Sequence, residues 1–209
     1  MNGLIRGRLV VGMVTACTIT GLFEAFATFR LAHPGVELTL LEDNSDRLIE
    51  RIRSGAADLA LIGTAGDPPH GLNALPILAE RLIAAVPTDH PLAKKRQATL
   101  ADITAYPIMT MPQGTGIRTV FDQACAANGI RPNVALQASA PAAIADLARR
   151  GLGIAILTES MVTQDDQRLK AITLSEIKTP ALLALIWGTT TSPALRELVK
   201  HSREAFQPA

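Results

Sequence analysis

The sequence predicts an α/β protein made of two similar subdomains. Short apolar runs typical of buried strands alternate with segments whose apolar residues recur at helical spacing. This succession occurs twice along the chain. In addition, 209 residues of which 48% are hydrophobic are enough to bury a core without disulfides or a structural metal.

The first half is predicted to run strand, helix, strand, helix, strand, which is typical of a parallel sheet with right-handed crossovers. The apolar runs predict strands at residues 9–14, 36–41 and 59–62. Leu22, Phe26 and Phe29 share one stripe of the first helix, which should end at His33-Pro34-Gly35. Ser45 is the expected N-cap of the second helix, and Gly55 marks its end.

The second half repeats this order after a Gly- and Pro-rich segment, residues 66–80, that we expect to be a loop. One helix should follow Thr115 and end at Gly129, and another should open at Ser139-Ala140-Pro141 and end at Gly151. A last helix follows Ser192-Pro193. The strands of this half are predicted at residues 82–86, 108–111, 134–136, 154–157 and 182–187.

The two halves align at a constant offset. Thr15 matches Thr110, Gly21 matches Gly116 and Phe26 matches Phe121, and Thr20 with Thr115 and Leu22 with Ile117 follow the same rule. We therefore expect a structural repeat, with the last strand and helix returning to the first lobe through a two-strand hinge. The predicted subdomains are residues 1–86 plus 187–209 and residues 87–186.

Composition excludes several classes of protein. A net charge of +1 disfavours a nucleic-acid-binding surface spread over the chain, and 3% aromatic residues cannot supply base-stacking platforms in number. Two cysteines, no long apolar stretch and no leader-like N-terminus favour a reducing, cytoplasmic setting.

The turn after the first strand of each half is the expected ligand site. These turns, residues 15–21 and 110–116, carry threonines and glycines and lead into helix N-termini. Two facing lobes would direct both turns at one cleft, which suits a small, anionic ligand. The alternative is that the threonines only cap helices. Arg118, in the first turn of a helix, should meet an anion or a carboxylate, with a role toward a ligand or the other lobe, or else lie exposed to solvent.

The sequence offers little support for an enzymatic function. No nucleotide-binding loop or nucleophile elbow occurs, and the four histidines are scattered without metal-ligand spacing, so we expect no cofactor and no metal. Cys17, at a helix start, is either a small core residue or a nucleophile of lowered pKa. Asp165-Asp166 is expected to be only a polar loop.

Several segments together resemble the effector-binding domain of LysR-type transcriptional regulators. They are Gly12, residues 29–38 (FRLAHPGVEL), Leu48 with residues 55–61 (GAADLAL), residues 90–93 with 100–103, and residues 151–157 (GLGIAIL). The resemblance covers residues 6–206. It implies two Rossmann-like subdomains in a type 2 periplasmic-binding-protein-like fold, with an inducer cleft between the lobes.

The resemblance also implies which residues contact the inducer. The implied ligand residues are Thr15, Ala16, Cys17, Thr18, Gly63, Thr64, Met111, Pro112, Gln113, Gly114, Thr115 and Ser139. Ala16 stands where the family commonly has a small hydroxyl residue.

The function that follows is sensing of a small metabolite by a homodimeric or homotetrameric regulator. DNA would be bound only through an N-terminal winged helix-turn-helix that this chain is expected to lack, and no membrane partner is expected. The alternatives are a solute-binding protein of a transport system, which would need an export signal or lipid anchor, and a small enzyme on the same bilobal fold.

Overall fold

The computed structural model describes residues 5–15, 19–162 and 166–206. The chain divides into two compact units. Unit 1 comprises Met1–Ile62, Pro68–Ile77 and Ala184–Ala209, and unit 2 comprises Gly63–Asp67 and Leu78–Leu183. Among the described residues, no helix is long and apolar enough to cross a membrane.

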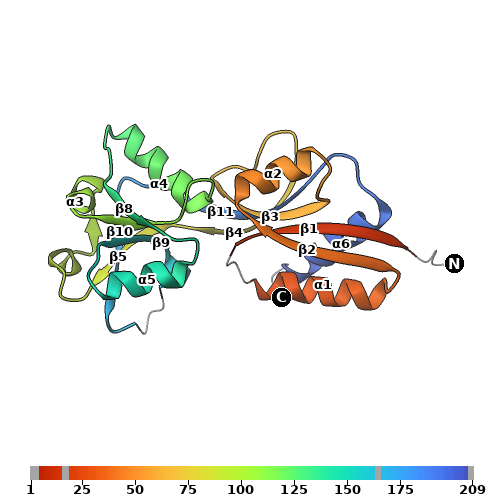
Figure 1. Ribbon diagram of the computed structural model, residues 1–209, viewed down its shortest axis with the longest axis horizontal. Coiled ribbons are helices and arrows are strands. Elements are labelled where there is room, and N and C mark those ends of the chain that lie inside the picture. Colours follow the sequence, from red (N-terminus) through yellow and green to blue (C-terminus); the bar gives the residue numbers. More distant parts are fainter. Residues whose placement is uncertain (1–4, 16–18, 163–165, 207–209) are drawn as a thin grey trace. The chain divides into compact units, whose positions relative to one another are not determined.

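Unit 1 is built on a five-stranded sheet of order β2-β1-β3-β11-β4, in which β1 lies parallel to β2 and β3. Helices α1 and α6 pack together on one face, and α2 covers the other (Figure 1). Gly12 leaves room for Leu48 of α2 to contact β1. The elements are β1 (Gly7–Val14), α1 (Thr20–Ala32), β2 (Val36–Asp43), α2 (Ser45–Arg53), β3 (Leu59–Ala65), β4 (Asn73–Glu80), β11 (Ala181–Trp187) and α6 (Pro193–Ala205).

Unit 2 is built on a six-stranded mixed sheet of order β6-β10-β5-β9-β7-β8. Strand β7 is parallel to β8 and β9, whereas β5 runs antiparallel to β9 and β10. The elements are β5 (Leu82–Pro87), η1 (Pro91–Lys94), β6 (Gln97–Ala98), α3 (Leu100–Thr104), β7 (Ile108–Thr110), α4 (Gly116–Ala127), β8 (Val134–Gln137), α5 (Pro141–Arg149), β9 (Ile154–Thr158), η2 (Glu159–Met161) and β10 (Leu169–Leu174).

The predicted repeat is present in the strand topology. In unit 1 the order β2-β1-β3 places the first strand of the repeat between the second and third, and β8-β7-β9 does the same in unit 2. All four neighbouring pairs in these two groups are parallel. The predicted fold class, α/β with two subdomains, is therefore confirmed.

Two local predictions were wrong, and a third was incomplete. Part of the expected loop at residues 66–80 is strand β4, whose edge position tolerates Pro76 because one side of an edge strand needs no hydrogen-bond donors. The N-cap of α2 is Asn44, whose side chain accepts from the Arg47 amide, and Ser45 is already helical. Of the expected polar loop Asp165-Asp166, Asp165 lies outside the described residues. Asp166 does lie in a loop, but its carboxylate also pairs with Arg149 at 2.6 Å and accepts from two backbone amides that lead into β10.

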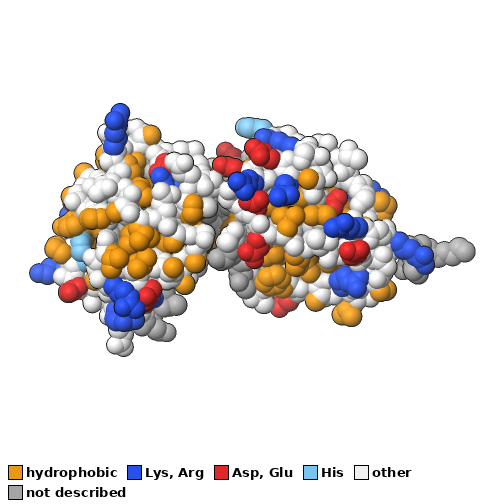
Figure 2. All heavy atoms as spheres, viewed as in Figure 1, with side chains coloured by type: hydrophobic (Ala, Val, Ile, Leu, Met, Phe, Trp, Pro, Cys, Tyr) orange, Lys and Arg blue, Asp and Glu red, His pale blue; other side chains and the backbone are white. Residues whose placement is uncertain are grey.

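The surface agrees with the near-neutral composition. On the face that Figure 2 shows, basic and acidic side chains are intermixed on unit 1 and no extended patch of one sign is visible. Opposite charges also pair within this unit, where Asp43 lies within 4 Å of Arg47 and Arg51. This face carries none of the single-sign charge expected of a nucleic-acid-binding surface.

Candidate functional site

The turn between β7 and α4 forms the centre of the candidate site in unit 2. Gly114 has a φ of 82°, a conformation that favours glycine, and allows the chain to turn sharply into the helix. The Thr115 hydroxyl accepts from the Arg118 amide at 3.4 Å and donates to the carbonyl of Pro112 at 2.8 Å. The capping role of Thr115 is thus confirmed, and Gln113 is the exposed side chain of the turn.

Gly63 and Thr64, near the end of β3, lie directly against this turn. A Cβ atom on Gly116 would be 2.6 Å from both the carbonyl carbon of Gly63 and the amide nitrogen of Thr64. Since real Cβ atoms are essentially never found so close to backbone, this approach requires a glycine at position 116. Two of the predicted ligand segments are therefore neighbours in space.

Ser139 belongs to the same edge of the sheet. Strand β8 ends beside β7, where the amide of Ala138 donates to the carbonyl of Thr110 at 3.3 Å. Ser139 is exposed and precedes Ala140, the N-cap of α5, which makes no side-chain capping bond. The expected helix start at Ser139-Ala140-Pro141 is confirmed, but Ser139 does not cap the helix, so its hydroxyl is not committed to the N-terminus of α5.

Two buried hydroxyls lie at this edge, that of Thr110 in the predicted ligand turn and that of Thr158, which the sequence did not single out. Thr110 and Thr158 end the neighbouring strands β7 and β9, are 0% and 3% exposed, and are the buried side chains of the described residues whose oxygens have no hydrogen-bond partner. The parallel register Ile108↔Ile154 places both threonines on one face of the sheet. A buried, unpartnered hydroxyl is unfavourable by about 1–3 kcal/mol, so this edge favours an additional polar group.

Arg118 meets a carboxylate, as its place in the first turn of α4 requires, but the carboxylate belongs to its own helix. The side chain is buried instead of exposed, and its guanidinium donates to both carboxylate oxygens of Asp122, one helical turn further on, at 2.8 Å. It also donates to the carbonyl of Met111 at 3.5 Å. Its charge is balanced within unit 2, and it holds the turn before α4 in place.

In unit 1 the structure describes only part of the predicted ligand segment. Thr15 is exposed at the end of β1, and Ala16, Cys17 and Thr18 lie outside the described residues. The other cysteine, Cys125, is buried, and burial together with the charges of Asp122 and Glu176 raises the pKa of its thiol to about 11. Cys125 is therefore unsuited to act as a nucleophile.

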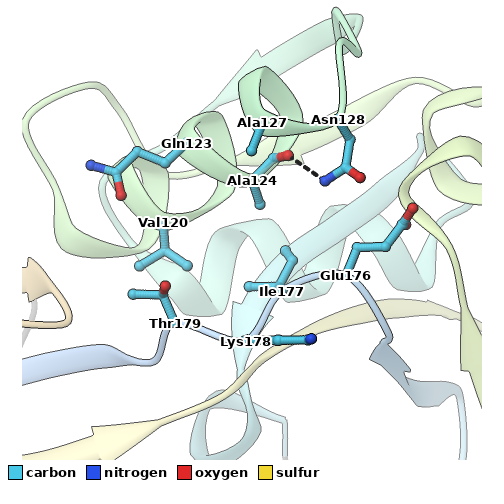
Figure 3. Close-up of a pocket in the computed structure, with 9 residues that line it drawn as sticks. All are labelled: Val120, Gln123, Ala124, Ala127, Asn128, Glu176, Ile177, Lys178 and Thr179. Carbon is cyan, nitrogen blue, oxygen red and sulfur yellow. Dashed lines mark hydrogen bonds between the residues drawn. The ribbon is translucent and has the colours of Figure 1, made fainter.

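A hollow of about 250 Å³ lies elsewhere on unit 2, between α4 and residues 176–179 (Figure 3). It faces the C-terminal half of α4 and contains none of the predicted ligand residues. The Glu176 carboxylate accepts from the Leu100 amide at the start of α3, and the Asn128 side chain donates to the carbonyl of Ala124. Because these polar groups already have partners, the carboxyl edge of the sheet is the better candidate site.

Comparison with known proteins identifies the family to which the chain is similar. The family model described as "LysR substrate binding domain" matches residues 2–207. The dual transcriptional regulator GltC of Bacillus subtilis (strain 168) is 28% identical over 204 residues, which cover 97% of this chain and 66% of that protein. The chain spans 64% of the length of a second B. subtilis regulator, YybE.

Solved structures show the same fold. The effector-binding domain of QuiR in complex with shikimate has a TM-score of 0.78 and 19% identity, with 97% of this chain and 98% of that one covered. The regulatory domain of CcmR from Synechocystis PCC6803 in complex with 2-PG has a TM-score of 0.77 and 20% identity, with the same coverage. At these identities the likeness concerns the fold alone.

Proposed function

The chain belongs to the family of LysR substrate-binding domains, and on this premise we propose that it senses a small anionic metabolite through the carboxyl edge of the unit 2 sheet. The curated relatives that match are transcriptional regulators, which favours a regulator over a solute-binding protein of a transport system. We propose that the domain itself acts by binding and not by catalysis, within a cytoplasmic regulator whose other part contacts DNA.

This proposal rests on several polar groups that lie together at the carboxyl edge of the unit 2 sheet and are available to bind a ligand. Gln113 and Ser139 are exposed there, and the Thr110 and Thr158 hydroxyls are buried without partners in the described part of the chain. The N-terminus of α4 adds backbone N–H groups and a partial positive charge. These groups suit a carboxylate or phosphate ligand that carries hydroxyl groups of its own. The neighbour QuiR binds shikimate, which is such a carboxylate.

The family resemblance adds unit 1 to the proposed site. Thr15 to Thr18 follow β1 as Met111 to Thr115 follow β7, and we propose that they contact the same ligand. We further propose that units 1 and 2 are the two regulatory subdomains. A ligand that prefers one arrangement of the subdomains would shift the population toward it, and contacts within a dimer or tetramer would pass the shift on.

A thermal-shift screen tests the proposal. The chain is heated with a panel of small carboxylates and phosphate esters that includes shikimate and 2-PG. A ligand at 100 times its Kd should stabilise the fold by about 2.7 kcal/mol, which corresponds to an increase in Tm of about 5–10 °C for a chain of this size.

Matched variants then locate the site. Gln113→Ala and Ser139→Ala should weaken binding of the ligand at least about tenfold, because each removes a polar contact worth about 1.5 kcal/mol. The control Gln123→Ala changes an exposed glutamine of α4 that lines the hollow of Figure 3, and this variant should bind the ligand as the parent chain does. A panel without any stabilising ligand, or binding unchanged in Gln113→Ala and Ser139→Ala, contradicts the proposed site.

A further inference from the structure

Unit 1 contains a cluster of side chains of types that can ligate a metal ion. The cluster lies at the opposite end of α1 from the predicted ligand turn. His33, Glu197 and His201 each offer one ligand atom, and these atoms lie within 4.8 Å of one another. Within residues 5–15, 19–162 and 166–206 this is the one group of three or more such side chains. Helix α1 starts at Thr20 and His33 is its C-cap, so about 20 Å of helix separates the cluster from the turn after β1.

The packing of α1 against α6 creates the cluster. Thr28 meets His201 while His33 meets Glu197, so the two helices run antiparallel here. Glu197 and His201 are one helical turn apart on α6 and face α1 together. All three side chains are half-buried, which leaves the cluster open to ions from solvent.

The spacing of the ligand atoms suits a bound cation better than a direct contact. His33 Nε2 lies 4.0 Å from Glu197 Oε2, which is too long for a hydrogen bond. Bonds of about 2.0–2.2 Å from zinc to nitrogen or oxygen would place tetrahedral ligand atoms about 3.4 Å apart. Side-chain rotations that bring these atoms closer by about 1.4 Å or less would therefore form the site.

The surroundings of His201 prepare it to act as a ligand. The Thr28 hydroxyl lies 3.0 Å from the carbonyl of Glu24 and 3.1 Å from that of Ala25, to which it can donate. Its oxygen can then accept from Nδ1–H of His201, 3.2 Å away. This tautomer leaves Nε2 of His201 unprotonated, as metal binding requires.

His33 is also held in place. Its amide donates to the carbonyl of Phe29 at 2.8 Å, and its carbonyl accepts from the amide of Val36 at 3.1 Å. The fully buried ring of Phe29 packs at 5.0 Å from the His33 ring and 5.9 Å from the His201 ring. This wall restricts both imidazoles and excludes water from one side of the cluster.

We propose that His33, Glu197 and His201 bind a divalent transition-metal ion with a preference for imidazole, of which Zn²⁺ is the representative. Two imidazoles and one carboxylate with a fourth position for water are a common ligand set for zinc, whereas Mg²⁺ and Ca²⁺ prefer oxygen ligands alone. The ion would join the C-terminal end of α1 to α6 and stabilise unit 1. The proposal does not depend on the effector site.

Calorimetric titration with Zn²⁺ tests the site on the chain without an affinity tag and after dialysis against a chelator. We expect one ion per chain, an increase in Tm with Zn²⁺ but not with Mg²⁺, and, for Co²⁺, visible absorption bands of tetrahedral coordination. His33→Gln and His201→Gln should each weaken Zn²⁺ binding at least about tenfold, since each removes one of three protein ligands.

Two further variants separate this site from other histidines and from loss of folding. His70→Gln changes an exposed histidine of the same unit and should bind Zn²⁺ as the parent chain does. Glu197→Gln keeps the shape of the side chain and should fold normally but bind Zn²⁺ more weakly. Zn²⁺ binding with a Kd above about 100 μM, binding of several ions per chain, or full binding by folded His201→Gln would overturn the proposal.

Discussion

Replacement of Gly116 by alanine tests the close contact on which the candidate site depends. The new Cβ would lie 2.6 Å from the backbone of Gly63 and Thr64, where ordinary contact begins at 3.4 Å, so α4 and the residue 63–64 segment must separate by about 0.8 Å. Overpacking of this kind destabilises by about 1–3 kcal/mol. Alanine regains less than about 1 kcal/mol of helix propensity at this first helical position. The expected net loss is about 1–2 kcal/mol, or about 3–6 °C in Tm.

The matched control is Gly21→Ala, the corresponding position of the repeat in α1. There the Cβ would meet the edge of the Phe206 ring at 2.9 Å, and a side chain at the end of α6 can move more easily than backbone. Urea unfolding should be followed by far-ultraviolet circular dichroism, because Trp187, the single tryptophan, lies in unit 1 and reports poorly on unit 2. If Gly116→Ala unfolds at the same urea concentration as the parent chain or as Gly21→Ala, the reasoning is refuted.

Two other outcomes are expected. Thr115→Ala should destabilise unit 2 by about 1 kcal/mol because α4 loses its N-cap, whereas Thr115→Ser should retain most of the stability; equal urea midpoints for these two variants would contradict the capping role. Burial lowers the pKa of His90, against a smaller opposing effect of Asp89, so the folded state favours neutral imidazole. The resulting stability is present above the ordinary pKa of 6.5 and is lost as the pH falls through the lower folded value. The parent chain should thus lose more stability than His90→Asn between about pH 7 and 5, and parallel pH profiles would show that His90 is not the cause.

Much of the fold could be predicted because it depends on local patterns. The strands β1, β3 and β9 are continuous apolar runs, and α1 and α4 carry their apolar residues at helical spacing. Strand β4 was not predicted, because it contains Pro76 and its residues are only partly buried, so its sequence lacks a continuous apolar run. Its role as an edge strand depends on its neighbour β11, which is distant in sequence.

The candidate site was predicted only in part. Its turns follow strands and precede helices, and this order is visible along the chain. The burial of Arg118, by contrast, depends on Asp122 and on the carbonyl of Met111, and a sequence pattern does not show whether such a charge is paired. Likewise, Thr110 and Thr158 resemble any strand threonine until the surrounding strands show that their hydroxyls lack partners.

The α/β class, the repeat and the positions of the turns proposed to bind a ligand follow from the sequence alone, because apolar periodicity and turn residues act over a few neighbouring positions. Which segments meet, by contrast, is known from the tertiary structure. It placed Gly63 and Thr64 against Gly116, and it brought His33 to Glu197 and His201. The reason is physical: contacts between residues far apart in the chain depend on how helices pack and how strands are ordered, and that information is distributed over the whole fold.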